Sequence, residues 1–417
     1  MQDGPSRLPS LPWQRPNATE AHAAEQLSEW QGAVLQEGGA AYLPFAWATW
    51  IDLARDRPAP PAPLNAGPAQ QLLATVGQHI EMLQHIGLLR RCGVTDLFWS
   101  HATTGLHHHQ GVRIHPFPLF PVRCTTHPAA AGGLPSSERR WLYSFQGVDR
   151  PDLYLTRVRE WILNLPPRPD ALVESRREWH FEQQVYREQV HGEPADAARH
   201  AELRMEADSF AATLQQSVFA LCPSGSGPNS IRLWEALGYG AIPVILADSL
   251  ALPGDAELWC QASVRVAETP EALAALPGQL EALRRDQARL RTLQAAGQQL
   301  WLRYGPGDFV ADLRTFLADP DGALVAAALN RLGNPENPIQ LCACQAASLP
   351  LDIARLLRNQ PPERPLLVTV QDSAPLPLLE ARWRTPLTLC RRLVGRRAWA
   401  ISCRSPKLEQ LASPQQS

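Results

Sequence analysis

The sequence has no long apolar run, no leader-like start and no excess of charge of one sign. None of its 417 residues lies in an apolar run of 18 or more, so it predicts no membrane-spanning helix. The first residues, MQDGPSRLPSLPW, lack a basic segment followed by an apolar core, which favours a cytoplasmic protein. A formal net charge of −2 gives no basic field for nucleic acid or an anionic membrane. We therefore expect partners to bind at a local site.

Metal-site patterns are also scarce. The 8 cysteines are scattered, and several lie in apolar runs, such as Cys222 in FALCP, which is typical of buried free thiols in a reducing compartment. Cys342 and Cys344 have no second pair at zinc-site spacing. The histidine triplet at 107–109 has no acidic or cysteine partner spaced with it, and no DxD motif stands at a plausible strand end. We therefore expect no metal ion.

Proline-rich stretches divide the chain. Three of them read as loops or linkers: DRPAPPAPLNAGPA (56–69), HPAAAGGLPSS (127–137) and NQPPERP (359–365). The length is sufficient for two or three separate cores. We predict an N-terminal domain over 1–136, a second domain over 137–330 and a C-terminal α/β extension over 331–417.

Both main domains are predicted to be parallel α/β units. Residues 72–93 read as a strand followed by a helix that ends at Gly93, and 94–102 reads as the next strand. After the second linker the pattern predicts strands over 139–147, 218–223 and 241–248. It predicts helices over 152–165, 206–217, 230–240, 271–304 and 307–319, with a break in the fourth of them near Pro277. The tail offers strands in IQLCACQ (339–345), PLLVTVQD (365–372) and AWAISCR (398–404).

The stretch ALCPSGSGPNSIRLWEALGYGAIPVIL (220–246) predicts a strand, a glycine loop, a helix and a strand. Gly225 and Gly227 allow backbone N–H groups to approach a ligand closely, and Asn229 or Ser230 stands where a helix N-cap belongs. Free N–H groups and the helix dipole favour an anion there, most often a phosphate. The loop follows a parallel strand, at the edge where open α/β sheets bind ligands.

Arg232 and Glu235 supply charge beside this loop. Arg232, in the first helical turn, has the planar fork that binds a diphosphate, and Glu235 has a carboxylate suited to a ribose diol. The alternative is an ordinary turn followed by a solvated Arg232–Glu235 ion pair.

Two ligand classes fit this local pattern. GSGPNS matches G-x-G-x-x-S, with Asp248 about 20 residues further on, which would suit a nicotinamide dinucleotide and an oxidoreductase. The third glycine of that fingerprint is missing, and the motif comes late in its domain. The other class is a nucleotide diphosphate sugar.

Residues 218–253, VFALCPSGSGPNSIRLWEALGYGAIPVILADSLALP, resemble the donor-site segment of the exostosin-like glycosyltransferases. The resemblance rests on Pro223, Gly225, Ser230, Arg232, Glu235, Ala236, Gly240, Pro243 and Leu252-Pro253. YSFQG, ending at Gly147, and the basic segment after it resemble the family's first donor-domain strand, with Arg157 and Arg159 as further basic candidates. VGQHI, LFWSHA and PFPLFPV resemble segments of bacterial members. The resemblance covers roughly residues 40–320, and the tail lies outside it.

The resemblance implies a GT-B fold, in which two Rossmann-like domains face each other across a cleft. It implies transfer, with inversion and without metal, from a nucleotide sugar, usually a uridine diphosphate sugar, to a glycan or lipid-linked glycan. Many animal and plant members carry a basic residue where this chain has Ser224, and they have an N-terminal membrane helix that is not seen here. We therefore expect a bacterial-type enzyme of surface polysaccharide or glycan synthesis. A catalytically inactive carbohydrate-binding relative remains the alternative.

The donor-site residues implied by this resemblance are Gly147, Arg157, Gly225, Gly227, Asn229, Ser230, Arg232 and Glu235. We expect the glycine loop, the start of the helix and Arg232 to stabilise the leaving diphosphate. Arg232 is therefore also expected to be a catalytic residue. The base that deprotonates the acceptor should come from the N-terminal domain, where His79, Asp96 and His101 stand at element ends. His101 follows the strand LFWS, so its side chain should reach the cleft, and we place it first.

Overall fold

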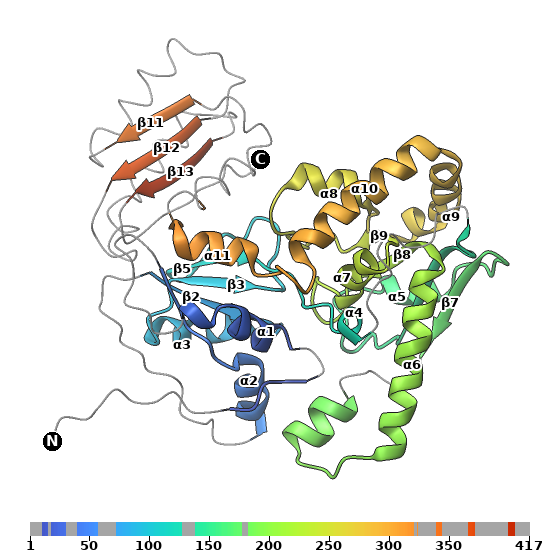
Figure 1. Ribbon diagram of the computed structural model, residues 1–417, viewed down its shortest axis with the longest axis horizontal. Coiled ribbons are helices and arrows are strands. Elements are labelled where there is room, and N and C mark those ends of the chain that lie inside the picture. Colours follow the sequence, from blue (N-terminus) through green and yellow to red (C-terminus); the bar gives the residue numbers. More distant parts are fainter. Residues whose placement is uncertain are drawn as a thin grey trace.

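The structure is a computed structural model of the chain. It contains two α/β units, each built on a five-stranded sheet, and a three-stranded sheet (Figure 1). It describes residues 11–15, 18–30, 40–56, 72–126, 138–176, 182–320 and 323, and the strands over 339–343, 366–371 and 399–404.

The N-terminal sheet has the order β1-β2-β3-β5-β4, and its strands are parallel except for β4, which is antiparallel to β5. Its strands are β1 (Ala40–Tyr42), β2 (Leu72–Gly77), β3 (Asp96–Trp99), β4 (His108–His109) and β5 (Val112–Pro116). The helices of this part are α1 (Thr19–Gln26), η1 (Ser28–Trp30), α2 (Trp47–Asp56), η2 (Met82–His85), α3 (Ile86–Arg91) and α4 (Arg123–Thr126). The predicted stop at Gly93 is confirmed, since this residue has a φ of 83° that a side chain would disfavour.

The second sheet has the order β10-β9-β8-β6-β7, with every strand parallel. Its strands are β6 (Trp141–Gly147), β7 (Ala171–Ser175), β8 (Ser217–Pro223), β9 (Ile242–Leu246) and β10 (Val264–Arg265). The helices are α5 (Val158–Leu163), η4 (Glu182–Val190), α6 (Ala197–Gln215), α7 (Ile231–Gly238), α8 (Ala256–Ala262), α9 (Pro270–Arg285), α10 (Gln287–Tyr304) and α11 (Ala311–Ala318).

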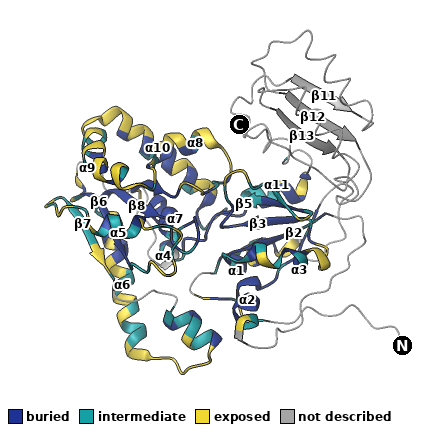
Figure 2. Cartoon of the chain, turned by 180° about the vertical axis from the view of Figure 1, so that it is seen from behind, coloured by how far each residue is buried: buried dark blue, intermediate teal, exposed yellow. Residues whose placement is uncertain are grey.

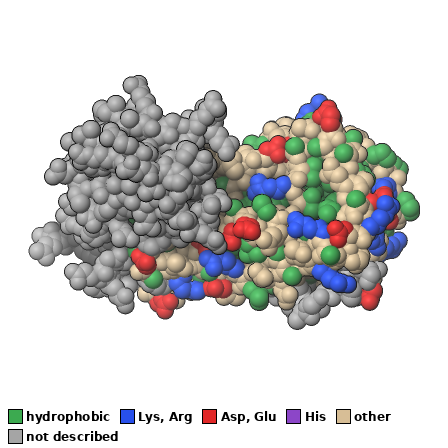
Figure 3. All heavy atoms as spheres, turned by 90° about the horizontal axis from the view of Figure 1, so that it is seen from above, with side chains coloured by type: hydrophobic (Ala, Val, Ile, Leu, Met, Phe, Trp, Pro, Cys, Tyr) green, Lys and Arg blue, Asp and Glu red, His purple; other side chains and the backbone are tan. Residues whose placement is uncertain are grey.

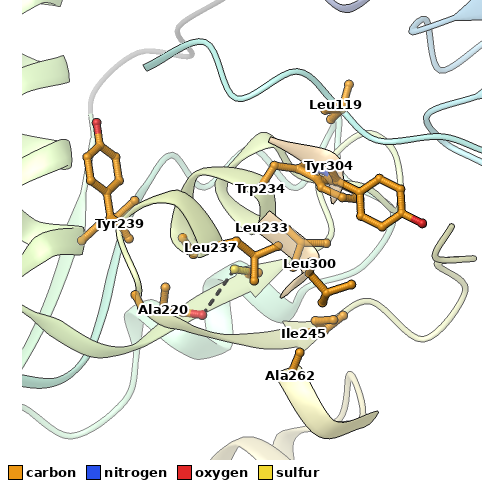
Figure 4. Close-up of a cluster of buried hydrophobic side chains, with 14 of the residues drawn as sticks. Leu119, Ala220, Leu233, Trp234, Leu237, Tyr239, Ile245, Ala262, Leu300 and Tyr304 are labelled. Atoms are coloured by element: carbon orange, nitrogen blue, oxygen red, sulfur yellow. Dashed lines mark hydrogen bonds between the residues drawn. The ribbon is translucent and has the colours of Figure 1, made fainter. Parts of the chain in front are cut away.

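The second domain has a core between its central strands and α7, α8 and α10. Trp234, Trp259 and Tyr304 pack there with ring centroids 5.6 to 6.4 Å apart, and Figure 4 shows Trp234 and Tyr304 against Leu233 and Leu300. The central strands of both sheets are coloured as buried in Figure 2, while exposed residues lie on β7 and along the outer sides of α6, α9 and α10. Cys222 is a buried free thiol, as expected.

Helix α11 connects the two domains. It lies within the range predicted for the second domain, yet Leu313, Phe316 and Leu317 pack into the core of the N-terminal sheet. Its buried side chains complete the apolar cluster formed by β1, β2 and α1, so the C-terminal end of the second domain is anchored on the first. The expected boundary at 136 falls outside the described residues.

Two helix predictions differ from the structure. The helix expected over 152–165 is only α5, because the backbone N–H of Leu155 bonds the carbonyl of Gly225 (2.9 Å) and holds the preceding segment as a loop. The break expected near Pro277 is absent. The chain breaks instead at Asp286, whose carboxylate accepts a hydrogen bond from the backbone N–H of Arg289 (2.9 Å) and caps α10.

The three strands predicted in the tail are present. They are β11 (Ile339–Ala343), β12 (Leu366–Gln371) and β13 (Trp399–Arg404), and they pair in parallel in the order β11-β12-β13.

Candidate functional site

A pocket lies where the carboxyl ends of the two sheets meet. From the second domain it is lined by Tyr154, Arg159, Val185, Tyr186, Gly225, Ser226, Gly227, Asn229, Ser230 and Ile231. From the N-terminal domain it is lined by Gln14, Asp52, Gln78, His79, Ile80, His101 and Leu119. The sequence-based expectation that the glycine loop and His101 face a common cleft agrees with this geometry.

The position of the pocket follows from the strand order of the second sheet. In chain order the strands run β6 to β10, and in space β6 pairs with both β7 and β8, so the order reverses between β6 and β8. Open parallel sheets bind ligands at such a switch point, because the loops on either side diverge and leave a crevice. The loop after β6 carries Tyr154 and leads into α5, which carries Arg159, and the loop after β8 carries Gly225 and Gly227.

The glycine loop makes its closest approach at Gly227. A Cβ built there would lie 2.3 Å from His101 Nδ1 and 2.8 Å from Ile80 Cγ2. At Gly225 a Cβ would lie 3.1 Å from Arg159 Nη2. Space therefore requires a glycine at 227, where the two domains meet, and at 225 a side chain would crowd the Arg159 guanidinium.

Asn229 and Ser230 lie between the loop and α7. Asn229 donates from Nδ2 to the carbonyl of Ser100 (2.7 Å) and accepts from Trp234 Nε1 (3.0 Å), so it ties α7 to the end of β3 across the domain boundary. Ser230 occupies the N-cap position, but its hydroxyl makes no capping hydrogen bond. Its side chain is one of those that line the pocket.

The basic candidates after β6 have different environments. Arg157 is exposed and pairs with Glu160 (2.5 Å), outside the pocket lining. Arg159 is partly buried: its Nε donates to the carbonyl of Ser224 (2.9 Å) and its guanidinium lies 4.5 Å from the Tyr154 ring centroid. Burial lowers the pKa of Arg159. Gly147 ends β6, and a Cβ there would meet Phe145 (2.8 Å) and Arg159 Nη1 (3.3 Å).

Arg232 lies behind the pocket. Its Nη2 donates to the carbonyl of Gln146 (2.5 Å) and its Nη1 to that of Leu221 (3.4 Å), so the guanidinium joins β6 to β8 beneath the switch point. It stacks 4.6 Å from the Phe145 ring centroid, and its Nε has no hydrogen-bond partner. Burial, followed by the charge of Arg159, lowers the pKa of Arg232 to about 9. The predicted fork is therefore directed at the sheet, and Arg232 does not line the pocket.

Glu235 also faces inward. It is 1 % exposed, accepts a hydrogen bond from the backbone N–H of Arg123 (3.3 Å), and leaves Oε2 without a partner. Burial raises its pKa to about 7, against the lowering effect of Arg123. The alternative of a solvated Arg232–Glu235 pair is wrong, because both side chains are buried. Glu235 does not line the pocket.

The three base candidates occupy different places. Asp96 begins β3, is fully buried, and binds Arg113 through both carboxylate oxygens (2.7 and 2.6 Å) and His115 (2.7 Å), so it is structural. His79 lines the pocket, with Nε2 3.2 Å from Asp52 and Nδ1 accepting the backbone N–H of Glu81 (3.1 Å).

His101 has the free nitrogen that a base requires. It hydrogen-bonds the backbone of Gln78, while its buried Nδ1 has no partner. Burial, and then the charge of His79, lowers the pKa of His101 to about 3, so the ring is neutral at neutral pH. His101 Nδ1 lies against the glycine loop at Gly227.

Among the polar residues of the lining that were not predicted are Gln14, Asp52, Tyr154 and Tyr186. Tyr154 was assigned to a helix, and its buried hydroxyl has no hydrogen-bond partner. The others reach the pocket only through contacts between segments distant in sequence. In the described part of the chain no three His, Cys, Asp or Glu side chains gather as a metal site, and none of the described helices is long and apolar enough to cross a membrane. Basic and acidic side chains are interspersed on the coloured surface in Figure 3.

The fold and the site together define an α/β protein with two sheets. Its glycine loop and the neutral imidazole of His101 line one pocket. Residues 89–276, from α3 into α9, match the family model of the Exostosin GT47 domain. This segment, less than half of the chain, is thus similar to the exostosin GT47 domain.

Similar proteins share a short segment. A probable glucuronosyltransferase of Oryza sativa subsp. japonica is 52 % identical over 56 residues, or 13 % of each chain. A probable beta-1,4-xylosyltransferase of Arabidopsis thaliana is 50 % identical over 56 residues, or 13 % of this chain and 14 % of that protein. The matched segment thus spans only about one eighth of either relative's length.

Proposed function

We propose that this chain is a GT-B type glycosyltransferase that moves a sugar from a nucleotide sugar to a hydroxyl group of a glycan. The observation that carries the proposal is the pairing, across one pocket, of an arginine and an imidazole. Arg159 has no carboxylate within ion-pair distance among the described residues, and His101 Nδ1 has no hydrogen-bond partner. A cation on one wall and a proton acceptor on the other are what glycosyl transfer needs.

The reaction follows from these two groups. The acceptor oxygen forms a bond to the anomeric carbon of the donor, while the bond from that carbon to the diphosphate oxygen breaks. The hydroxyl proton passes to His101 Nδ1, and the electron pair leaves with the nucleoside diphosphate beside Arg159 and the glycine loop. His101 and Arg159 line the pocket from different domains, so we infer that attack and departure occur on opposite sides and that the configuration inverts.

The positive charges of Arg159, at the pocket, and Arg232, behind it, support a reaction without a metal ion. The diphosphate would lie near Arg159, at the N-terminus of α7, with Arg232 behind the sheet. The dipole at such a terminus adds roughly 0.3 to 1 kcal/mol of stabilisation for an anion. Arg232, which bonds both strands at the switch point, acts as a positioning residue for the loop.

The donor class also belongs to this proposal. We infer a uridine diphosphate sugar, and the names of the relatives above refer to glucuronosyl and xylosyl transfer. Membership in a bacterial-type branch, a cytoplasmic location and a role in surface polysaccharide or glycan synthesis stay predictions.

The test is a ligand panel followed by an assay of donor turnover. Uridine diphosphate should raise the melting temperature, and a nicotinamide dinucleotide should not. With a uridine diphosphate sugar, the protein should release uridine diphosphate, and turnover should survive EDTA. Stabilisation by the dinucleotide alone would support the oxidoreductase alternative, and sugar binding without turnover would support the inactive relative.

A further inference from the structure

The pocket has a second wall, distinct from the loop that faces the donor. It consists of Gln14, Asp52, Gln78, His79, Val185 and Tyr186, which we call the strap wall. Four of these residues belong to the N-terminal domain. The other two belong to η4, which leaves the second domain between β7 and α6 and reaches across to α2. In Figure 1 this is the light-green helix below α6, beside α2.

Three contacts hold the strap in place over the N-terminal domain. The backbone N–H of Arg15 donates to Gln189 Oε1 and Gln189 Nε2 donates to the carbonyl of Arg15, each at 3.1 Å. Arg55 Nη1 lies 3.4 Å from the hydroxyl of Tyr186. The strap therefore presents Val185 and Tyr186 to the pocket from a defined position.

The floor below the strap is a connected set of buried hydrogen-bonding side chains. Gln14 Nε2 donates to Asp52 Oδ2 (2.5 Å), Gln78 Nε2 donates to Gln14 Oε1 (3.4 Å), and His79 lies 3.2 Å from Asp52 Oδ1. Each of these side chains is at most 8 % exposed. Such fixed amide, carboxylate and imidazole groups, facing an aromatic ring, suit the hydroxyl groups and the apolar face of a sugar ring.

The charge of the strap wall limits which sugar fits. None of its described residues is Lys or Arg, whereas it contains the carboxylate of Asp52. The arginine that touches this wall, Arg55, is bound by two carboxylates, Asp52 (3.2 Å) and Glu81 (2.8 Å). An additional carboxylate from a ligand would meet repulsion from Asp52 without an uncommitted cation on the strap wall to offset it, since Arg159 belongs to the donor side of the pocket.

We propose that the strap wall is the acceptor subsite and that it takes a neutral terminal sugar, with the ring against Tyr186 and the attacking hydroxyl toward His101. This inference rests on the proposed function. It assigns η4 a role in choosing the acceptor, separate from the donor loop on the opposite wall.

The first experiment compares acceptors. Release of uridine diphosphate from a uridine diphosphate sugar is measured with xylotetraose and cellotetraose, and with tetragalacturonate and a tetrasaccharide ending in glucuronate. The neutral oligosaccharides should accelerate release at least tenfold over hydrolysis, and the uronates should not. Acceleration by the uronates, or by none of the four while hydrolysis proceeds, overturns the inference. Absence of donor hydrolysis and of nucleotide binding would instead count against the proposed function.

The second experiment changes the strap. Tyr186→Ala and Tyr186→Leu should raise the KM for the best neutral acceptor at least tenfold, whereas donor KM and donor hydrolysis stay within twofold. Tyr186→Phe, which keeps the ring, should stay within threefold of the parent protein. Arg187→Ala on the same helix is the matched control, since Arg187 is exposed and outside the lining, and it should change nothing. An unchanged acceptor KM in Tyr186→Leu, or an equal loss of donor hydrolysis, overturns the inference.

The third experiment tests the charge. Asp52→Asn removes the negative charge of the wall and leaves Arg55 with Glu81 alone. The ratio of kcat/KM for the glucuronate-ended acceptor to that for its neutral counterpart should rise at least fivefold. A ratio that stays the same or falls would show that Asp52 does not set acceptor charge.

Discussion

Gly227→Ala is the substitution that tests the pocket most directly. Gly227 has no positive φ that would require glycine, so its role is spatial. A methyl group there would lie 2.3 Å from His101 Nδ1, and real Cβ atoms essentially never approach another atom within 3.0 Å. The loop and the imidazole must therefore separate by at least about 0.7 Å (3.0 − 2.3).

The size of the effect follows from this displacement. His101 cannot rotate freely, because it is hydrogen-bonded to the backbone of Gln78, and Ile80 Cγ2 blocks the methyl group on another side at 2.8 Å. Overpacking of this kind typically costs about 1 to 3 kcal/mol of stability. A misplacement of about 1 Å between reacting groups can lower the rate about 10²-fold. We expect kcat/KM for donor transfer to fall about that much while the protein stays folded.

The assay is steady-state release of uridine diphosphate, with a melting curve for each variant. Gly278→Ala is the matched control, since Gly278 lies exposed in α9 and an added Cβ meets no atom within 4 Å. That control should keep full activity and gain about 0.5 to 1 kcal/mol from helix propensity. A Gly227→Ala protein with kcat/KM within threefold of the parent would refute the close approach of His101 to the loop during turnover.

Three further predictions concern the charged groups of the site. Arg159→Gln should lower kcat by about 10² to 10³, whereas Arg157→Gln, at the exposed Glu160 pair, should leave kcat unchanged; equal losses would contradict the assignment. Because burial lowers the pKa of His101 to about 3, kcat/KM should stay level from pH 8 down to pH 5 if His101 is the base, and an acid limb near 6.5 would contradict a base with this lowered pKa. Burial raises the pKa of Glu235 from 4.5 to about 7, so its contribution to stability is complete below pH 4.5 and lost as pH rises through 7. The free energy of unfolding of Glu235→Gln, relative to that of the parent, should therefore rise by up to about 3 kcal/mol between pH 4.5 and pH 8, as measured by denaturant unfolding. The variant should bind uridine diphosphate as tightly as the parent does, and a tenfold weaker affinity would support the ribose role.

The alternation of strands and helices was readable from the sequence because the central strands of both sheets are parallel and buried. Runs such as VFALCP and AIPVILAD have few polar residues, as β8 and β9 require with helices on both sides. Short elements were harder to predict. The strand β7 and the helix η4 have intermediate burial and no clear period, and neither was predicted. The position of α11 could not be inferred, because its apolar face carries no information about which sheet it covers.

The glycine loop and His101 were found because each directly follows a strand, and the carboxyl ends of parallel strands share one edge. The strap wall could not be found in the same way. Tyr186 and Asp52 are separated by more than 130 residues and meet only because η4 crosses to α2. Neither residue stands in a motif, and polar residues on a helix usually face solvent.

The direction in which α7 presents its side chains separates residues that line the pocket from those that hold the loop. Ser230 and Ile231, at the start of the helix, line the pocket, whereas Arg232 and Glu235 share the opposite, buried face, as a spacing of three residues requires. Arg232 ties β6 to β8, and Trp234 fixes Asn229, which in turn bonds the end of β3. The charged residues that stand out in the sequence of this stretch, Arg232 and Glu235, therefore lie behind the pocket and do not line it. The groups that line the pocket are the less distinctive ones: Gly225, Gly227, Ser230 and, from the start of α5, Arg159.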